Sequence, residues 1–314
     1  MTKTTVYVLT VMFIVPSLLA VSATAVDGVP DVREVRSVED RSGKDDLLYG
    51  TLFGGASIES NCFVDVDASG NVYLAGSTLS SEFPTTVGAY DVSPNGHYDV
   101  FAMKLSADGI VLEFSTLIGG SISDMCQAMV VDASGHMYIA GYTLSSDFPT
   151  TDGAYGEAYT AGPNDLFVLR LDPTGSSLEY STYLGGEGTE HVGDICLDGS
   201  GNLFLTGETD SVYFPTTEDA YDSTMSGEED CFITKLSPDG SSLVYSTFVG
   251  GNKMDLGDAI EVDAQGRAVV AGVTWSTRGF HVSTDAYDND RSGASDGFVL
   301  RLSADGTDVV MSTL

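Results

Sequence analysis

A Gly-Gly pair returns at a nearly constant interval along the chain, and this period constrains the fold more than any other feature. The four pairs are Gly54-Gly55, Gly119-Gly120, Gly185-Gly186 and Gly250-Gly251. Successive pairs are separated by 65, 66 and 65 residues. A fixed period of this size is typical of an array of similar structural units, each packed against its neighbours.

Each period holds four short runs that favour β-strands. In the third period these runs are residues 180–184, 191–198, 203–207 and 230–236. They are rich in β-branched and aromatic residues, and clusters of Gly, Pro, Asp and Ser separate them. Four antiparallel strands per unit are the anatomy of a β-propeller blade, whereas the coils of a β-solenoid are usually much shorter. We therefore predict an all-β fold, a β-propeller with four repeats of about 65 residues.

We name the strands of a blade A to D from the inside outward. Strand A precedes an Asp-x-x-Gly turn, strand B follows it, strand C is an Asp-x-Phe run and strand D a Tyr-Ser-Thr run. A further D-like run at residues 47–53 precedes the first strand A, so five D strands accompany four sets of A, B and C. In a ring closed by its ends, the surplus strand predicts further blades after Leu314, three of them if the ring has seven.

The motifs of each period form a specific series. They are Tyr-Ser-Thr-x-Leu-Gly-Gly, Val-Asp-x-x-Gly-Asn, Ala-Gly-x-Thr, Phe-Pro-Thr-Thr, Ala-Tyr, Asp-x-Phe and Lys-Leu-x-x-x-Gly. This series resembles the SBBP repeat, the seven-bladed β-propeller repeat of secreted prokaryotic proteins, over residues 47–314. The fourth period departs most, with Phe280-His281-Val282-Ser283 in place of Phe-Pro-Thr-Thr. The resemblance implies an extracellular propeller and brings no established catalytic residues.

The N-terminus has the features of a secretory signal peptide. Lys3 supplies a positive charge, residues 6–20 form an apolar stretch broken by Pro16, and Ala23-Thr24-Ala25 is an A-x-A cleavage site. We therefore predict a signal peptide at residues 1–25, a flexible polar and charged lead-in at 26–46, and the propeller at 47–314. Cleavage near Ala25 would leave a secreted or cell-surface protein with no membrane insertion, because the apolar stretch is too short to span a bilayer.

The chain is strongly acidic, with a formal net charge of −33 and only 13 Lys and Arg residues. Such a surface repels nucleic acid and anionic membranes, so we exclude both as partners. Solubility in a saline habitat and cation binding both account for this acidity, and the sequence does not separate them.

Two segments have the Asp-x-Asp-x-Ser-Gly spacing of a calcium loop, and they supply the candidate metal ligands Asp65, Asp67, Asp288 and Asp290. The bidentate Glu that an EF-hand needs at its twelfth position is replaced by Gly76 and Val299. Neither segment is therefore an EF-hand, and a looser calcium site is the remaining metal hypothesis.

Several residues recur in every period and favour structural roles. The Asp at the end of strand A predicts an Asx turn, although a ring of carboxylates that holds a cation is the alternative. These residues are Asp67, Asp132, Asp198 and Asp263. The Gly late in strand B predicts a bulge. These residues are Gly76, Gly141, Gly207 and Gly272.

Recurrent aromatic and basic residues predict contacts that hold the blades together. The aromatic residues are Phe101, Phe167, Phe232 and Phe298, with Tyr90, Tyr155, Tyr221 and Tyr287. Each basic residue is expected to pair with the acidic residue that opens strand C. The basic residues are Lys104, Arg170, Lys235 and Arg301, and the acidic residues are Asp99, Asp165, Asp230 and Asp296.

The four cysteines show no zinc spacing and occupy different positions in their repeats. They are Cys62, Cys126, Cys196 and Cys231. Export permits disulfides. Cys196 and Cys231 should not pair because strand B separates them, and a Cys62–Cys126 bridge is conceivable but not favoured.

The long connections point to where a function would lie. The B–C connections have roughly twenty residues, vary between repeats, and should share one face with the D–A connections that carry the Gly-Gly pairs. No enzyme motif is present, so we expect a non-catalytic scaffold that binds an extracellular protein or polysaccharide through this face. The alternatives are a carbohydrate-active enzyme, a glycoside hydrolase or polysaccharide lyase using acidic residues near the central channel, and a structural cell-surface or adhesive component.

Overall fold

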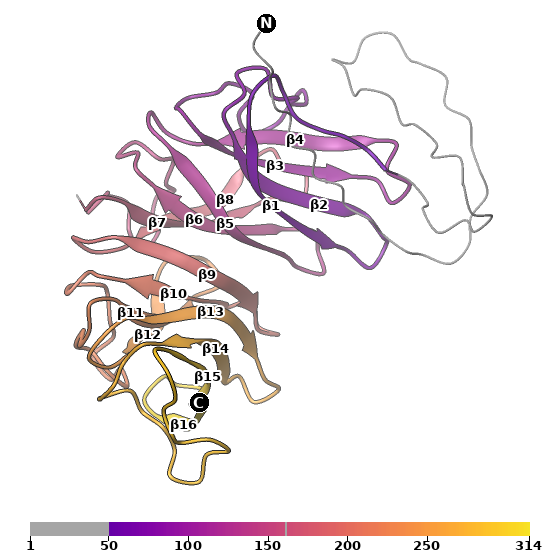
Figure 1. Ribbon diagram of the computed structural model, residues 1–314. Helices are drawn as coiled ribbons and strands as arrows, with labels where there is room; N and C mark the ends of the chain where they lie inside the picture. Colours follow the sequence, from indigo (N-terminus) through magenta and orange to yellow (C-terminus); the bar gives the residue numbers. More distant parts are fainter. Residues whose placement is uncertain (1–49, 161) are drawn as a thin grey trace, which may run out of the picture.

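The computed structural model describes residues 50–160 and 162–314, which form sixteen β-strands. The strands form four antiparallel four-stranded sheets, each in sequence order, so every sheet is one predicted blade with strands A to D (Figure 1). The coarse prediction of an all-β repeat fold built from such blades is confirmed. In this part of the chain no helix is long and apolar enough to cross a membrane. The predicted signal peptide and lead-in lie outside the described residues.

The strands have nearly equal lengths in all four blades. The first blade contains β1 (Glu59–Val66), β2 (Val72–Thr78), β3 (Asp99–Leu105) and β4 (Leu112–Ile118). The second contains β5 (Asp124–Val131), β6 (Met137–Thr143), β7 (Asp165–Leu171) and β8 (Leu178–Leu184). The third contains β9 (Glu190–Leu197), β10 (Leu203–Thr209), β11 (Asp230–Leu236) and β12 (Leu243–Val249). The fourth contains β13 (Asp255–Val262), β14 (Ala268–Thr274), β15 (Asp296–Leu302) and β16 (Val309–Thr313).

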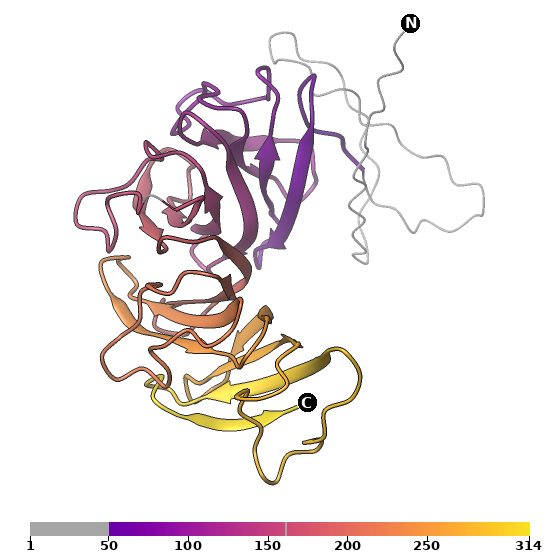
Figure 2. The same ribbon diagram turned by 60° about the vertical axis from the view of Figure 1, so that its left-hand side comes forward.

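The blades follow one another around an open arc, as in a propeller (Figure 2). The A strands of successive blades, β1, β5, β9 and β13, lie next to one another along the inside of this arc. The first and the last blade stand at its two ends and do not meet. Residues 50–53, the described part of the predicted surplus D strand, form no strand, although Phe53 packs edge-on against Phe101 at 5.7 Å between ring centroids.

The hydrophobic core lies between adjacent blades and is built largely from strands B and C. The central strands are buried along almost their whole length, as in β6 and β7. The predicted strand C phenylalanines are all buried, and Phe101, Phe167 and Phe232 each stack on the Phe that opens the Phe-Pro-Thr-Thr motif. Large aromatic rings are thus buried together with aliphatic side chains between the blades.

The predicted bulge opposite the strand B glycine is confirmed. The register shifts in strand A opposite or next to Gly141, Gly207 and Gly272, and a Cβ at any of the three would collide with a strand A carbonyl oxygen. Glycine is therefore required here by close backbone approach.

The predicted tyrosine packing is only partly correct. Tyr90 and Tyr155 are more than a third exposed, and Tyr287 is 98% exposed. The backbone N–H groups of Tyr90, Tyr155 and Tyr221 donate instead to carbonyl oxygens in the C–D turn of the following blade. These tyrosines therefore mark a backbone link between blades, while their rings remain partly in solvent.

Candidate functional face

The B–C loops meet the D–A connections at their ends, as predicted from topology. The amide of Asp124 donates to Tyr98 O at 2.8 Å, and the amide of Asp255 donates to Glu229 O at 2.8 Å. The side-chain amide of Asn164 donates to Glu190 O at 3.1 Å. We call the surface formed by these loop ends and the D–A connections the D–A face. Its backbone is fixed by hydrogen bonds between loops, so it can present side chains at defined positions.

The middle of each B–C loop does not belong to this face, contrary to the prediction. It runs along the outer edge of strand D, where the Phe-Pro-Thr-Thr motif forms hydrogen bonds that we call the D-strand latch. In the second blade, Thr151 N donates to Ser181 O at 3.0 Å, and Ser181 Oγ donates to Pro149 O at 2.6 Å. The reason is physical: an edge strand has unpaired backbone groups, and the loop covers them.

The fourth period keeps part of this latch despite its different sequence. Ser283 stands where the other blades have Thr, and its amide donates to Ser312 O at 3.0 Å. Its hydroxyl accepts from Ser312 N at 2.9 Å. Ser312 Oγ has no hydrogen-bond partner, so this blade keeps the two bonds of Ser283 and lacks the bond that Ser181 Oγ makes to Pro149 O in the second blade.

An acidic residue four positions after each Gly-Gly pair anchors the D–A connection. These residues are Glu59, Asp124, Glu190 and Asp255. Each accepts a hydrogen bond from the second Gly amide, for example 2.7 Å from Gly120 N to Asp124 and 3.3 Å from Gly186 N to Glu190. Each also accepts from hydroxyls at the end of strand B and the start of the B–C loop. We did not single out these acids from the sequence, although their fixed distance from the Gly-Gly pair is a readable signal.

At each junction this acid lies close to the acid that opens strand C of the preceding blade. The pairs are Asp99 with Asp124, Asp165 with Glu190, and Asp230 with Asp255. All six side chains are buried. Burial raises the pKa of Asp124 to about 6 and that of Glu190 to about 7, and the neighbouring carboxylate adds to both shifts. Two carboxylates that are close together and shielded from water favour the binding of a proton or a cation.

The predicted ion pairs of the strand C basic residues are wrong. Lys104 Nζ pairs with Glu113 at 2.8 Å and Lys235 Nζ with Asp198 at 3.3 Å. The acid that opens strand C stands at one end of the strand and the basic residue near the other, so their side chains do not meet. The basic residues therefore reach the A–B turn and strand D on the opposite face.

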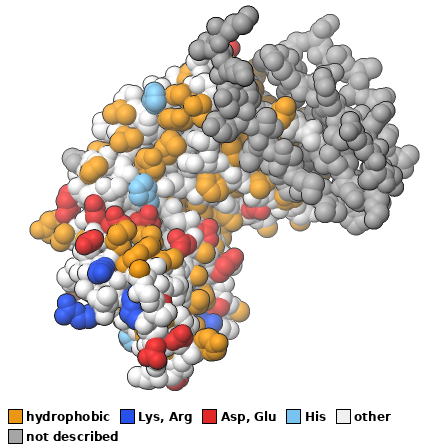
Figure 3. Space-filling view, in the orientation of Figure 1, with side chains coloured by type: hydrophobic (Ala, Val, Ile, Leu, Met, Phe, Trp, Pro, Cys, Tyr) orange, Lys and Arg blue, Asp and Glu red, His pale blue; other side chains and the backbone are white. Residues whose placement is uncertain are grey.

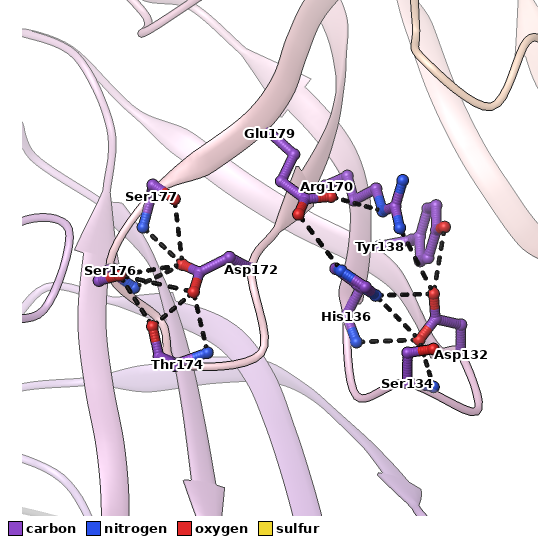
Figure 4. A network of polar contacts seen from close by, with 10 residues as sticks. All are labelled: Asp132, Ser134, His136, Tyr138, Arg170, Asp172, Thr174, Ser176, Ser177 and Glu179. Carbon is purple, nitrogen blue, oxygen red and sulfur yellow. Dashed lines mark hydrogen bonds and ion pairs between the residues drawn. The ribbon is translucent and has the colours of Figure 1, made fainter.

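Figure 4 shows this opposite face in the second blade. Asp132 accepts from Ser134 N at 2.8 Å and His136 N at 3.0 Å, which confirms the predicted Asx turn. The His136 ring lies between Asp132 and Glu179, and Arg170 Nε approaches Glu179 Oε2 at 3.0 Å. These contacts join the A–B turn, strand C and strand D of the blade, so this face is a stabilised set of turns.

Three of the four predicted calcium residues accept hydrogen bonds from structural partners. Asp65 Oδ2 accepts from Val131 N in the next inner strand at 2.9 Å, and Asp67 accepts from Ser69 N, Asn71 and Tyr73 in its turn. Asp288 Oδ1 accepts from Asp290 N at 3.0 Å. Across residues 50–160 and 162–314, no three acidic, His or Cys side chains are grouped as a metal site. All four cysteines are free, and three of them are buried.

The D–A face carries exposed apolar side chains that differ between blades. Ile122 and Val212 are about half exposed or more, and Tyr213 is 81% exposed. Tyr213 stands between Ser211, whose hydroxyl accepts from Gly188 N at 2.6 Å, and the buried Phe214. The ring thus projects from an anchored segment beside the D–A connection. Glu82, Asp147 and Gly279 occupy the same repeat position in the other blades.

Glu208 on β10 has the environment of a titrating acid. Its side chain is half-buried, and burial together with the nearby carboxylates of Glu229 and Asp258 raises its pKa to about 7. Basic side chains are few on the side of the molecule shown in Figure 3, where acidic side chains lie among apolar ones. An acid with this pKa can exchange a proton near neutral pH.

No family model matches the chain, and no curated protein is similar to it. Among solved structures, a protein of unknown function from Dyadobacter fermentans aligns at 14% identity with a TM-score of 0.45, covering 83% of this chain and 70% of that one. BamB from Moraxella catarrhalis aligns at 9% identity and a TM-score of 0.34, covering 87% and 70%. A Synechocystis apocarotenoid oxygenase mutant aligns at 11% identity with a TM-score of 0.29, covering 82% of this chain and 70% of that one. These scores are low, and no function is taken from these proteins.

Proposed function

We propose that the chain is an exported, non-catalytic scaffold of the SBBP-repeat kind that binds an extracellular ligand through its D–A face. We also propose that its four blades belong to a larger propeller ring, since the blades stand in an open arc. The predicted signal sequence supports export, and the strongly acidic composition supports a soluble extracellular role.

The observation that carries the binding proposal is the contrast between backbone and side chains on the D–A face. The same carboxylate network fixes each D–A connection, whereas the exposed side chains beside it change from blade to blade. A rigid backbone with variable side chains is the usual design of a recognition surface. Tyr213 is the best anchor, because a Tyr ring gives a large contact area at low entropic cost.

Binding of the full chain to an array of bacterial and plant polysaccharides tests this proposal. We expect saturable binding to at least one glycan, and we expect Tyr213→Ala to weaken it about tenfold or more, as for a buried aromatic anchor. Tyr287→Ala is the matched control, since Tyr287 is also exposed but belongs to the latch segment of the fourth blade. Equal affinities for wild type and Tyr213→Ala would place the binding surface elsewhere.

A carbohydrate-active enzyme is the second candidate, and Glu208 is the observation that favours it. Its raised pKa would suit a general acid if a sugar reached it. Incubation of each bound polysaccharide with wild type and Glu208→Gln separates the two functions. Chain cleavage that Glu208→Gln abolishes would establish the enzyme, whereas binding without turnover supports the scaffold.

A further inference from the structure

We propose that the first two blade junctions each bind a calcium ion between two buried carboxylates. The first site uses Asp99 and Asp124, and the second uses Asp165 and Glu190. These sites differ from the Asp-x-Asp loops that the sequence suggested, and they do not depend on the ligand-binding role of the D–A face.

The first argument is that each site contains a buried carboxylate oxygen with no hydrogen-bond partner. Asp99 Oδ1 and Glu190 Oε2 are both in this position, on side chains that are at most 2% exposed. The second oxygen of each group is well satisfied, for example Asp99 Oδ2 by Asn95 N at 2.9 Å. A buried unsatisfied oxygen is costly, and binding of a cation would satisfy each of them.

The second argument is that these unpartnered oxygens lie close to an oxygen of the partner carboxylate. A Cβ placed on Gly185 would stand 2.9 Å from Glu190 Oε2 and 3.1 Å from Asp165 Oδ1, so both oxygens face the same point. A Cβ on Gly119 would stand 2.8 Å from Asp124 Oδ2 and closer still to Asp99 Oδ1. The first Gly of each Gly-Gly pair therefore keeps the space between the two carboxylates open.

The third argument is charge. Among the described residues, none of the four carboxylates forms an ion pair with Lys, Arg or His. Each site thus buries two acids without a basic side chain to balance them. Burial raises the pKa of all four groups, because desolvation disfavours their charged forms.

The third junction provides an internal contrast. Asp255 Oδ1 is also buried without a hydrogen-bond partner there. Burial raises the pKa of Asp255 as well, but the positive charge of Arg291 opposes the rise. Arg291 Nη2 also donates to Thr274 O at 3.2 Å and pairs with Asp296 at 3.3 Å. An arginine is therefore present at the junction of Asp230 and Asp255, and we assign no calcium ion to it.

The chemistry of the donors selects calcium among common ions. Carboxylate, carbonyl and hydroxyl oxygens are hard ligands, and calcium accepts roughly six to eight of them in irregular geometry. No third acidic side chain joins either pair in the part of the chain that the structure describes. The remaining ligands would be backbone carbonyl oxygens of the D–A connection, hydroxyls or water.

Calorimetric titration of calcium chloride into the chelator-treated full chain at pH 8 tests the proposal. We expect two ions per chain and a rise in the thermal midpoint of about 5 °C or more at saturation. Asp124→Asn and Glu190→Gln should each remove one ion, because an amide keeps the shape of the carboxyl group but loses its charge. Native mass spectrometry of the wild type counts the ions independently of any variant.

Glu59→Gln is the matched control. Glu59 has the same Gly, Thr and Ser partners as Glu190, but no strand C acid of a preceding blade faces it within the described residues. It should leave the count at two ions. Calcium uptake unchanged in both Asp124→Asn and Glu190→Gln would overturn the proposal. A wild-type protein that binds no calcium and is stabilised only by acidification would overturn it too, because each carboxylate pair would then share a proton.

Discussion

At the scale of single residues, the structure shows why two glycines are needed at each D–A connection. The first Gly leaves room for carboxylate oxygens, whereas a Cβ on the second would collide with a Ser at the start of the next B–C loop, 2.5 Å away for Gly120 and Ser145. The Gly-Gly pair is therefore a steric requirement of the junction between two blades. This explains why it recurs more regularly than the loops around it.

Glu208 makes stability depend on pH. Its folded-state pKa of about 7 lies above the ordinary value of 4.5, so folding favours the protonated form. The stability that the protonated Glu208 contributes to the folded state is fully present below about pH 4.5, and it is lost as the pH rises through about 7. We expect Glu208→Gln to be more stable than wild type by about 1–3 kcal/mol at pH 8, with little difference at pH 4. Urea unfolding at both pH values measures this.

Glu218→Gln serves as the control for that measurement, since Glu218 lies in a B–C loop outside the strands. It should change stability by less than about 0.5 kcal/mol at either pH. A Glu208→Gln variant with equal stability to wild type at pH 8 would show that Glu208 is solvated and ordinary.

For the residues that recur in every period, the sequence predicted the type of local structure better than it predicted the contact partner. The Asx turns were predicted correctly because an Asp three residues before a Gly determines its own local hydrogen bonds. The ion pairs of Lys104 and Lys235 were not, because a long side chain selects its partner from neighbouring strands. The carboxylate pairs were missed for the same reason, since their members come from different blades.

At the scale of elements, all four strands of each blade follow from short β-favouring runs and turn residues. The alternation of apolar and polar residues is weak in strands B and C because both of their faces are buried. The turn residues, and not this alternation, indicated where these strands end. The path of the B–C loop was not predictable. Hydroxyl groups about thirty residues apart form the D-strand latch, and a sequence pattern does not reveal such pairing.

Ser181→Ala tests the D-strand latch. Ser181 is fully buried, and its loss would leave Pro149 O without its donor in a dry place. We expect a cost of about 1–3 kcal/mol in the free energy of unfolding. Ser241→Ala removes an exposed hydroxyl that donates to Asp239 at 2.7 Å, and it should cost less than about 0.5 kcal/mol. Equal effects in urea unfolding would show that the latch does not stabilise the blade.

At the scale of the whole molecule, the blades are coupled through their inner strands and their outer turns. Asp65 and Asp194 each accept from an amide of the next inner strand, Val131 N at 2.9 Å and Ile260 N at 3.1 Å. On the outside, Tyr155 N donates to Gly240 O in the following blade at 2.9 Å. Because neighbouring blades are in contact at their inner strands and at their outer turns, they form one cooperative unit rather than separate domains.

Gly240→Ala tests this outer coupling. Gly240 has a φ of +70°, and a Cβ there would stand 2.5 Å from the Tyr180 ring of the preceding blade. Gly266→Ala is the matched control, because Gly266 has a φ of +76° in a turn with no atom within 4 Å of the added Cβ. Backbone strain alone should cost Gly266→Ala about 1 kcal/mol. The added clash between blades should raise the cost for Gly240→Ala to roughly 2–5 kcal/mol, measured by urea unfolding. Equal costs would mean that the ring and turn separate freely, and that the outer contact does not join the blades.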